Sequence, residues 1–247
     1  MNIDRRTVLT LPVVAALSVA GAPAVAAAAV LPQQSPIDIR VRNIIRRRTI
    51  PQLGVYYSTD TAVSVRYVRR DETSVDGCSV RGVEETEEIE VEPGAGWIQF
   101  DGNRYELLQF HFHTPSEHTV EGRHALLEMH LVHRSAAGVR LVIAIFLVPG
   151  HSSEPDQVLR RLPGECAEPL EIEHVNLSAL LPDNRSTVRY TGSLTTSPYT
   201  EGVLWFIAVP KTVSQEGINN FQTLFPEGDS RPTQPLNGRI ITADIRW

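Results

Sequence analysis

The sequence predicts a single mostly β domain, built on a large twisted and mainly antiparallel central sheet with a few short peripheral helices. Short runs in which apolar and polar residues alternate recur along most of the chain, and turns rich in Gly and Pro separate them. Helical spacing of apolar residues is limited to three short segments. The 247 residues could form one large domain or two small ones, but no linker or internal repeat follows residue 31. One domain is therefore the simpler expectation.

The first 30 residues predict a cleavable signal peptide of the twin-arginine kind. Arg5-Arg6 precedes a mostly apolar, Ala-rich run that ends near Ala26-Ala27-Ala28. The run is long enough to be a membrane anchor instead, but two internal prolines and the cleavable alanines favour removal. We therefore expect residues 31–247 to be exported, by the twin-arginine route, to the cell envelope or the extracellular space, with no stable membrane anchor after cleavage.

The individual elements follow from hydrophobic periodicity and turn residues. The run 139–148 is apolar apart from its second residue and is bounded by turns, which predicts a central strand buried on both faces. The acidic run 84–88 is expected in a solvated loop, and 190–200 in a turn-rich segment. Expected strands cover 37–39, 55–70, 89–91, 97–100, 108–113, 127–132, 139–148 and 203–209. Expected helices cover 154–162, 177–181 and 214–221.

Three histidines are spaced as metal ligands on neighbouring strands. With a period of two, His111 and His113 point to one side of their strand, and His130 points to one side of the next apolar-polar run. If these strands pair in antiparallel fashion, the three imidazoles share one face. Three neutral nitrogen ligands that leave a fourth tetrahedral position open are typical of catalytic zinc. We therefore predict a Zn²⁺ site.

Two polar residues are placed to orient these ligands. Gln109 precedes His111 by two positions and Glu128 precedes His130 by two, so each shares a strand face with its histidine. Metal-bound histidines usually donate from their second ring nitrogen to such a group. An ordinary buried polar pair would have the same spacing. Cys78 and Cys166 allow one disulfide at most, and the sequence leaves their pairing open.

Three separate segments resemble the α-class carbonic anhydrases, in the order of that family: QSPIDI, LLQFHFHTPSEHTVEGRHALLEMHLVH and YTGSLTTSPYTEGVLWF. The resemblance covers most of the chain from Gln34 onward and, with the signal peptide, indicates an exported bacterial member. It implies that residues 31–247 form a catalytic domain that hydrates carbon dioxide reversibly to bicarbonate and a proton, through a zinc-bound hydroxide. Carbon dioxide and bicarbonate are then the expected partners. The net charge of −6 gives no reason to expect nucleic acid, and the oligomeric state stays open.

The resemblance also assigns roles to individual residues. It makes His111, His113 and His130 the zinc ligands, and Gln109 and Glu128 the groups that hold two of them. The Thr195 hydroxyl would accept a hydrogen bond from the hydroxide and donate one to Glu117, while Thr196 would line the bicarbonate site. An apolar wall for CO₂ would be formed by Val132, Val142, Leu194 and Trp205. From the residues alone, plain core packing explains these four equally well.

One departure from the family concerns proton transfer. The family's shuttle histidine usually lies in the segment before the histidine strand, but 80–109 contains no histidine, and Glu87 takes its place in the alignment. A carboxylate of ordinary pKa matches proton transfer near pH 7 poorly. We therefore expect turnover to depend on external buffer. Near the C-terminus, Arg231 is retained, and the Asp229 carbonyl is expected to orient His113.

Two other functions fit part of the pattern. His111-x-His113-x3-Glu117 matches part of a cupin-type metal motif, in which Glu117 would be a ligand, although Tyr105 and His124 stand where glycines are expected. A non-catalytic zinc-binding module on the carbonic anhydrase fold is the second alternative.

Overall fold

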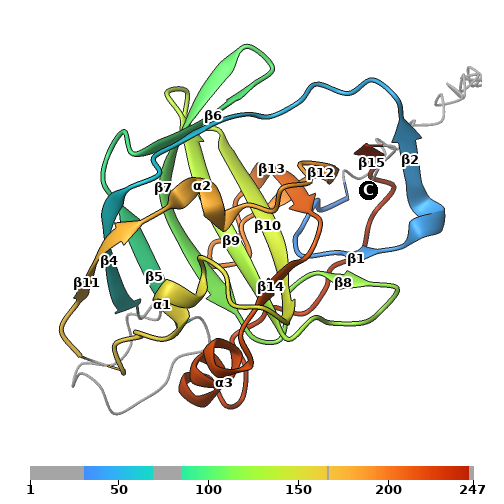
Figure 1. Ribbon diagram of the computed structural model, residues 1–247. Helices are drawn as coiled ribbons and strands as arrows, with labels where there is room; N and C mark the ends of the chain where they lie inside the picture. Colours follow the sequence, from blue (N-terminus) through green and yellow to red (C-terminus); the bar gives the residue numbers. More distant parts are fainter. Residues whose placement is uncertain (1–30, 69–84, 166, 245–247) are drawn as a thin grey trace, which may run out of the picture. The chain divides into compact units, whose positions relative to one another are not determined.

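A 13-stranded sheet dominates the described part of the chain, residues 31–68, 85–165 and 167–244, in this computed structural model (Figure 1). Its main path runs β11-β4-β5-β7-β9-β10-β13-β12-β15-β2. All described elements belong to a unit that runs from Pro32 to Trp247. The predicted signal peptide and both cysteines lie outside the described residues. The strands are β1 Asp38–Ile39, β2 Ile44–Arg47, β3 Gly54–Tyr57, β4 Thr61–Val68, β5 Thr86–Val91, β6 Gly96–Phe100, β7 Asn103–His113, β8 Thr119–Val120, β9 Leu127–Ser135, β10 Arg140–Pro149, β11 Leu170–Val175, β12 Thr187–Ser193, β13 Glu201–Ala208, β14 Lys211–Val213 and β15 Ile241–Asp244.

Most strand pairs are antiparallel, as the sequence predicts, but the centre of the sheet is mixed. β10 pairs with β9 antiparallel and with β13 parallel. β14 and the β2–β15 edge pair add further parallel contacts. β10 is buried along almost its whole length, which confirms the prediction of a strand covered on both faces.

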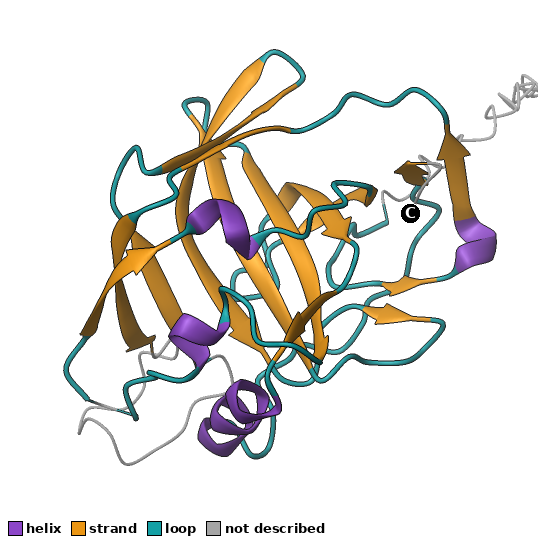
Figure 2. Cartoon of the chain, in the orientation of Figure 1, coloured by secondary structure: helices purple, strands orange, loops and turns teal. Residues whose placement is uncertain are grey.

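The helices are few and lie beside the sheet rather than within it (Figure 2). α1 is Asp156–Leu159, α2 is Leu177–Leu180 and α3 is Gln215–Leu224, with a short 3₁₀ turn at Val41–Asn43. The α3 position confirms the prediction: the Ser214 side chain accepts from the Gly217 N–H as an N-cap. α1 is shorter than the predicted 154–162: Pro155 stands at its N-cap, and Pro163 disfavours helix at the last predicted residue.

Two other predicted segments differ in the structure. The single strand expected over 55–70 divides into β3 and β4, because the Ser58 hydroxyl accepts from Asp60 N–H and closes a turn. The acidic run expected in a loop instead enters β5, where Glu87 has no exposed surface. Charge alone favoured a loop, whereas strand pairing with β4 and β7 decides the conformation.

The sheet separates two apolar clusters. One contains Phe110 and Phe112 of β7 with Met129 of β9, and extends under α1 and α3. The other contains Val142 of β10 and Trp205 of β13 and lies on the opposite side of these strands. Alternation along β7 and β9 therefore sends aromatic and aliphatic residues into the first cluster and the histidines toward the second.

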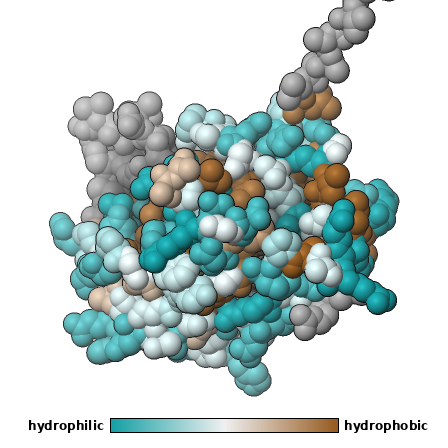
Figure 3. All heavy atoms as spheres, turned by 90° about the horizontal axis from the view of Figure 1, so that it is seen from above, coloured by the Kyte–Doolittle hydropathy of each residue, from teal (hydrophilic) through white to brown (hydrophobic). Residues whose placement is uncertain are grey.

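The surface is mainly polar. Figure 3 shows one face, where hydrophilic residues predominate and apolar residues form small separate groups. No helix among the described residues combines the length and the apolar character needed to cross a membrane.

Candidate active site

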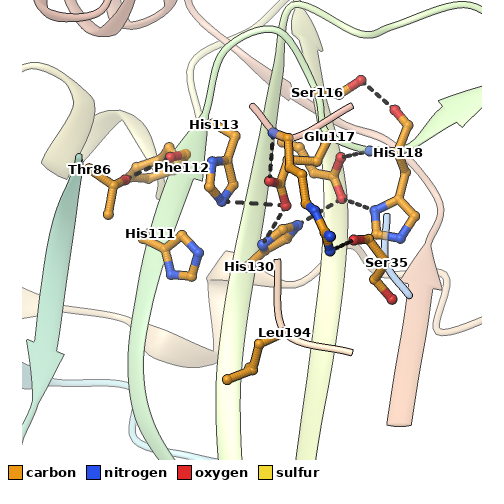
Figure 4. A network of polar contacts seen from close by, with 12 residues as sticks. Ser35, Thr86, His111, Phe112, His113, Ser116, Glu117, His118, His130 and Leu194 are labelled. Carbon is orange, nitrogen blue, oxygen red and sulfur yellow. Dashed lines mark hydrogen bonds and ion pairs between the residues drawn. The ribbon is translucent and has the colours of Figure 1, made fainter. Parts of the chain in front are cut away.

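The pairing of β7 with β9 brings the three predicted metal ligands together. His111 lies directly opposite His130, and His113 lies opposite Glu128, two pairs further along. The ring centroids of His111, His113 and His130 are 4.8 to 5.2 Å apart. One nitrogen from each ring lies within 4.8 Å of the others, and all three side chains are buried. The predicted shared face is therefore confirmed, and Figure 4 shows the rings converging.

One nitrogen of each ring is held by a different group. His111 Nδ1 lies 2.9 Å from Gln109 Oε1, and His130 Nε2 lies 2.8 Å from Glu128 Oε1, as the sequence predicts. His113 Nδ1 lies 3.2 Å from the Asp229 carbonyl oxygen, which confirms the third expectation. The candidate metal-binding atoms are therefore the other nitrogens, Nε2 of His111, Nε2 of His113 and Nδ1 of His130.

The loop that presents Asp229 depends on a close backbone approach. Gly228 has φ +80°, and a Cβ there would lie 2.6 Å from the Thr114 carbonyl oxygen. Only glycine tolerates both the conformation and the distance. Asp229 then accepts from the Thr114 N–H at 2.7 Å, which fixes the carbonyl beside His113.

The donor set fits a divalent cation. His113 Nε2 is buried and has no hydrogen-bond partner among the described residues. Burial would lower the pKa of His113, but the charges of Glu117 and Asp229 beside it raise that pKa to about 9. Positive charge is thus favoured at this atom. Three imidazole nitrogens around one point are ligands that zinc prefers, so the residues fit Zn²⁺.

Glu128 holds more than one ring. Its Oε1 also lies 2.6 Å from His118 Nδ1, and its Oε2 accepts from the His118 N–H at 2.8 Å. His118 Nε2 lies 2.7 Å from the Tyr190 hydroxyl, which donates to Ser35 Oγ. Burial opposes ionisation of Glu128, but His118 and His130 hold its pKa well below the usual range. Figure 4 shows His118 and His130 on either side of this carboxylate.

Sequence reasoning missed His118, Tyr190 and Ser35. All three fall inside the quoted segments, but period-two alternation gives no reason to select a histidine in the turn after β7. Ser35 and Tyr190 are 155 positions apart. The only local signal is Gly192, where a Cβ would lie 2.0 Å from Ser35 Oγ, so that the close contact requires glycine.

An apolar cavity of ≈ 180 Å³ opens beside the histidines. Its wall includes all five residues predicted for the substrate pocket, and His111, His130 and Thr195 line the same space. Trp205 is fixed there because its indole N–H donates to the Ser193 carbonyl at 2.9 Å and its ring packs 5.0 Å from that of His130. The predicted pocket residues are Val132, Val142, Leu194, Thr196 and Trp205. The structure brings them together, and their roles remain predictions.

A second cavity of ≈ 140 Å³, the polar cavity, has more charged and hydroxyl-bearing residues in its lining and meets the first at His111, Thr195 and Thr196. Glu117 lines it, fully buried, and accepts from the Arg231 N–H at 3.0 Å through Oε1. Glu117 Oε2 lies 3.7 Å from His113 Nε2 and has no hydrogen-bond partner among the described residues. No hydrogen bond joins Thr195 to Glu117 within the described chain, although both residues of the expected pair line this cavity.

The structure does not place Glu87 at the cavity. Glu88 lies directly opposite His111, so the alternation of β5 turns Glu87 to the other face, with Ile89 and the first apolar cluster. Burial there raises the pKa of Glu87 to about 8. Sequence alignment cannot resolve a shift of one residue, which in a strand reverses the side chain's direction. Glu85 and Thr86 line the polar cavity instead.

Glu88 is a further residue that sequence reasoning missed. Its Oε2 accepts from Gln109 Nε2 at 3.2 Å, and its Oε1 from Arg66 at 3.2 Å. Because the amide nitrogen of Gln109 is committed to Glu88, its carbonyl oxygen faces His111. Glu88 therefore helps to fix the hydrogen-bonded ring nitrogen of His111.

A family model described as eukaryotic-type carbonic anhydrase matches residues 24–245. The chain belongs to this family. A carbonic anhydrase of Klebsiella pneumoniae is 39% identical over 150 residues, which are 60% of this chain and 61% of that protein. A carbonic anhydrase of Nostoc is 38% identical over 164 residues, covering 65% of this chain and 61% of the relative. The match thus spans about three fifths of these curated relatives.

A solved structure gives the same result over more of the chain. The α-carbonic anhydrase of Thermovibrio ammonificans, in complex with the inhibitor sulfanilamide, has a TM-score of 0.72 and is 35% identical. The match covers 85% of this chain and 86% of that one. The family match overturns the cupin-type alternative. That alternative makes Glu117 a metal ligand, but the converging group of three histidines does not include Glu117.

Proposed function

We propose that this carbonic anhydrase family member binds Zn²⁺ through His111, His113 and His130 and catalyses the reversible hydration of carbon dioxide to bicarbonate and a proton. The observation that carries the proposal is the buried, unpartnered Nε2 of His113, which faces two further imidazoles at the edge of an apolar cavity. Family membership supports the activity. Zinc in such a site acts as a Lewis acid that lets a water lose its proton near neutral pH, as is general for carbonic anhydrases.

The chain's own residues supply binding and orientation. Carbon dioxide is uncharged and has few polar handles, so an apolar wall of Val132, Val142 and Trp205 suits it better than a polar one. Thr195 lines both cavities, and its hydroxyl would orient a nucleophilic oxygen held beside the histidines. Glu117 accepts from the Arg231 N–H, which keeps its second oxygen directed toward the metal-facing nitrogens.

Proton release depends on solvent in this proposal. The cavities are lined by no histidine besides the three ligands, as far as the described residues go. Glu87 is turned away, and buffer in the cavity mouth accepts the proton instead. Export by a twin-arginine signal belongs to the same proposal and is supported by the sequence of the first 30 residues alone.

The test compares two histidine variants. His113→Ala removes a ligand, whereas His151→Ala removes an exposed histidine outside the site and serves as the matched control. We expect one zinc per chain and CO₂ hydration, measured by stopped flow, in the wild type and the control. His113→Ala should lose bound zinc and most of the hydration activity. Zinc-loaded wild type without hydration activity would identify a non-catalytic zinc-binding module and overturn the enzymatic proposal.

A further inference from the structure

A charged residue lies beside the apolar wall of the cavity next to the three histidines. Arg140 begins β10 and lines the cavity together with Val142 and His130. Residues 140 and 142 share one face of the strand, which is the face directed at the cavity. Arg140 is half-buried, so its aliphatic stem can extend the apolar wall while its guanidinium reaches the opening.

A second arginine lies directly across from the first. The register of β9 and β10 pairs Arg134 with Arg140, which puts their Cβ atoms about 5 Å apart. Neither side chain has an ion pair or hydrogen bond among the described residues. Glu106, the residue opposite Arg134 on β7, makes its ion pair with Arg104 instead. Like charges directly opposite each other destabilise a sheet. An ion of opposite charge between them would remove this repulsion.

We propose that Arg140, at the outer end of the cavity beside the three histidines, and Arg134, which lines a neighbouring cavity, together form a binding site for a small oxyanion. An oxyanion between the two guanidinium groups would relieve their repulsion and accept hydrogen bonds from both. Each planar guanidinium presents paired N–H donors that match two oxygens of one anion. The chain as a whole carries a net charge of −6, so this pair is a local exception to the prevailing charge.

Two sources of oxyanion share this chemistry. Bicarbonate would be held on its way between the cavity and solvent, which rests on the proposed function. A phosphate-type buffer anion would be held where it can accept the proton that the reaction releases. The site itself requires neither zinc nor turnover, so its existence can be tested independently of catalysis.

The experiment measures anion binding to the full chain, as purified and after zinc removal by a chelator. Inorganic phosphate is titrated at pH 8 and followed by ³¹P NMR line width, and ¹³C-labelled bicarbonate is titrated in parallel. Arg140→Gln and Arg134→Gln remove one cation each. Arg47→Gln, an exposed arginine of β2 at the edge of the sheet, removes the same charge elsewhere. Thermal unfolding confirms that each variant is folded.

We expect about tenfold weaker binding in Arg140→Gln, ~1.4 kcal/mol, a similar loss in Arg134→Gln and no change in Arg47→Gln. Arg140→Lys should retain part of the affinity, because charge remains but the planar fork is lost. The losses should be equal with and without zinc. Preferential binding of one anion identifies the source. Absence of saturable binding, or binding that neither substitution weakens, would overturn the proposal, whereas loss of CO₂ hydration alone would not.

Discussion

Replacing Glu128 by glutamine should weaken zinc binding without removing any ligand. Glu128 Oε1 lies 2.6 Å from His118 Nδ1 and 2.8 Å from His130 Nε2, and Oε2 accepts from the His118 N–H. Glutamine has nearly the same shape but exchanges one oxygen for an NH₂ group. If the NH₂ group takes the Oε2 position, it meets the His118 N–H; if it takes the Oε1 position, it meets both imidazoles.

When His130 carries its proton on Nε2, as it must to offer Nδ1 to a metal, either orientation of the substituted amide sets a donor against a donor, in a site with no exposed surface. Each charge-assisted hydrogen bond that is lost contributes about 1.5–3 kcal/mol. The Nε2 atom of His130 also loses its carboxylate partner, which fixes the tautomer that leaves Nδ1 free for the metal. Loss of such a partner lowers metal affinity by about 10–100-fold, which corresponds to ~1.4–2.7 kcal/mol.

The assay is a competition titration against a zinc chelator, with thermal unfolding of the metal-free protein measured alongside. Glu216→Gln, an exposed carboxylate on α3, is the control for loss of charge. Zinc affinity within about twofold of the wild type in Glu128→Gln would refute the reasoning, because the geometry leaves no arrangement in which all donors are satisfied.

Three further predictions follow from buried or crowded positions. First, CO₂ hydration should accelerate with added imidazole, and Glu87→Gln should leave this buffer response unchanged, because Glu87 faces the apolar cluster; a flat buffer response in the wild type would contradict the expected proton route. Second, the folded-state pKa of Glu87, about 8, lies above its ordinary value of 4.5, so the folded protein holds a proton that the unfolded chain loses. Stability to denaturant should therefore fall as pH rises from 4.5 to about 8, and Glu87→Gln should flatten this slope. Third, Gly192→Ala should destabilise the fold by about 1–3 kcal/mol, since its Cβ would lie 2.0 Å from Ser35 Oγ; an unchanged thermal unfolding midpoint would contradict the close contact.

The sequence predicts the cluster of three histidines well because its geometry is local. Period-two alternation alone places His111 and His113 on one face, and the adjacent run supplies His130. The same rule selects Gln109 and Glu128, since each lies two positions from its histidine. The structure confirms all of these contacts.

Features that depend on long-range contacts could not be predicted in the same way. The Ser35–Tyr190–His118 network joins segments that are distant in sequence, and its only local trace is a glycine. The parallel pairing of β10 with β13 depends on how the connection between them crosses the sheet, which hydrophobic patterning does not specify.

Glu87 shows how an alignment without strand register fails. The alignment placed the shuttle position one residue away from positions that do face the cavity. In a strand, a shift of one residue turns the side chain from the cavity toward the core. The pairing of Glu88 with His111 supplies the missing register.

The most direct test of the central claim is stopped-flow CO₂ hydration by the wild-type protein before zinc removal, after it, and after re-addition of one equivalent of zinc. The three-histidine site predicts activity that disappears with the metal and returns with one zinc per chain. Activity that survives complete zinc removal, or a zinc-reloaded protein that remains inactive, would contradict it.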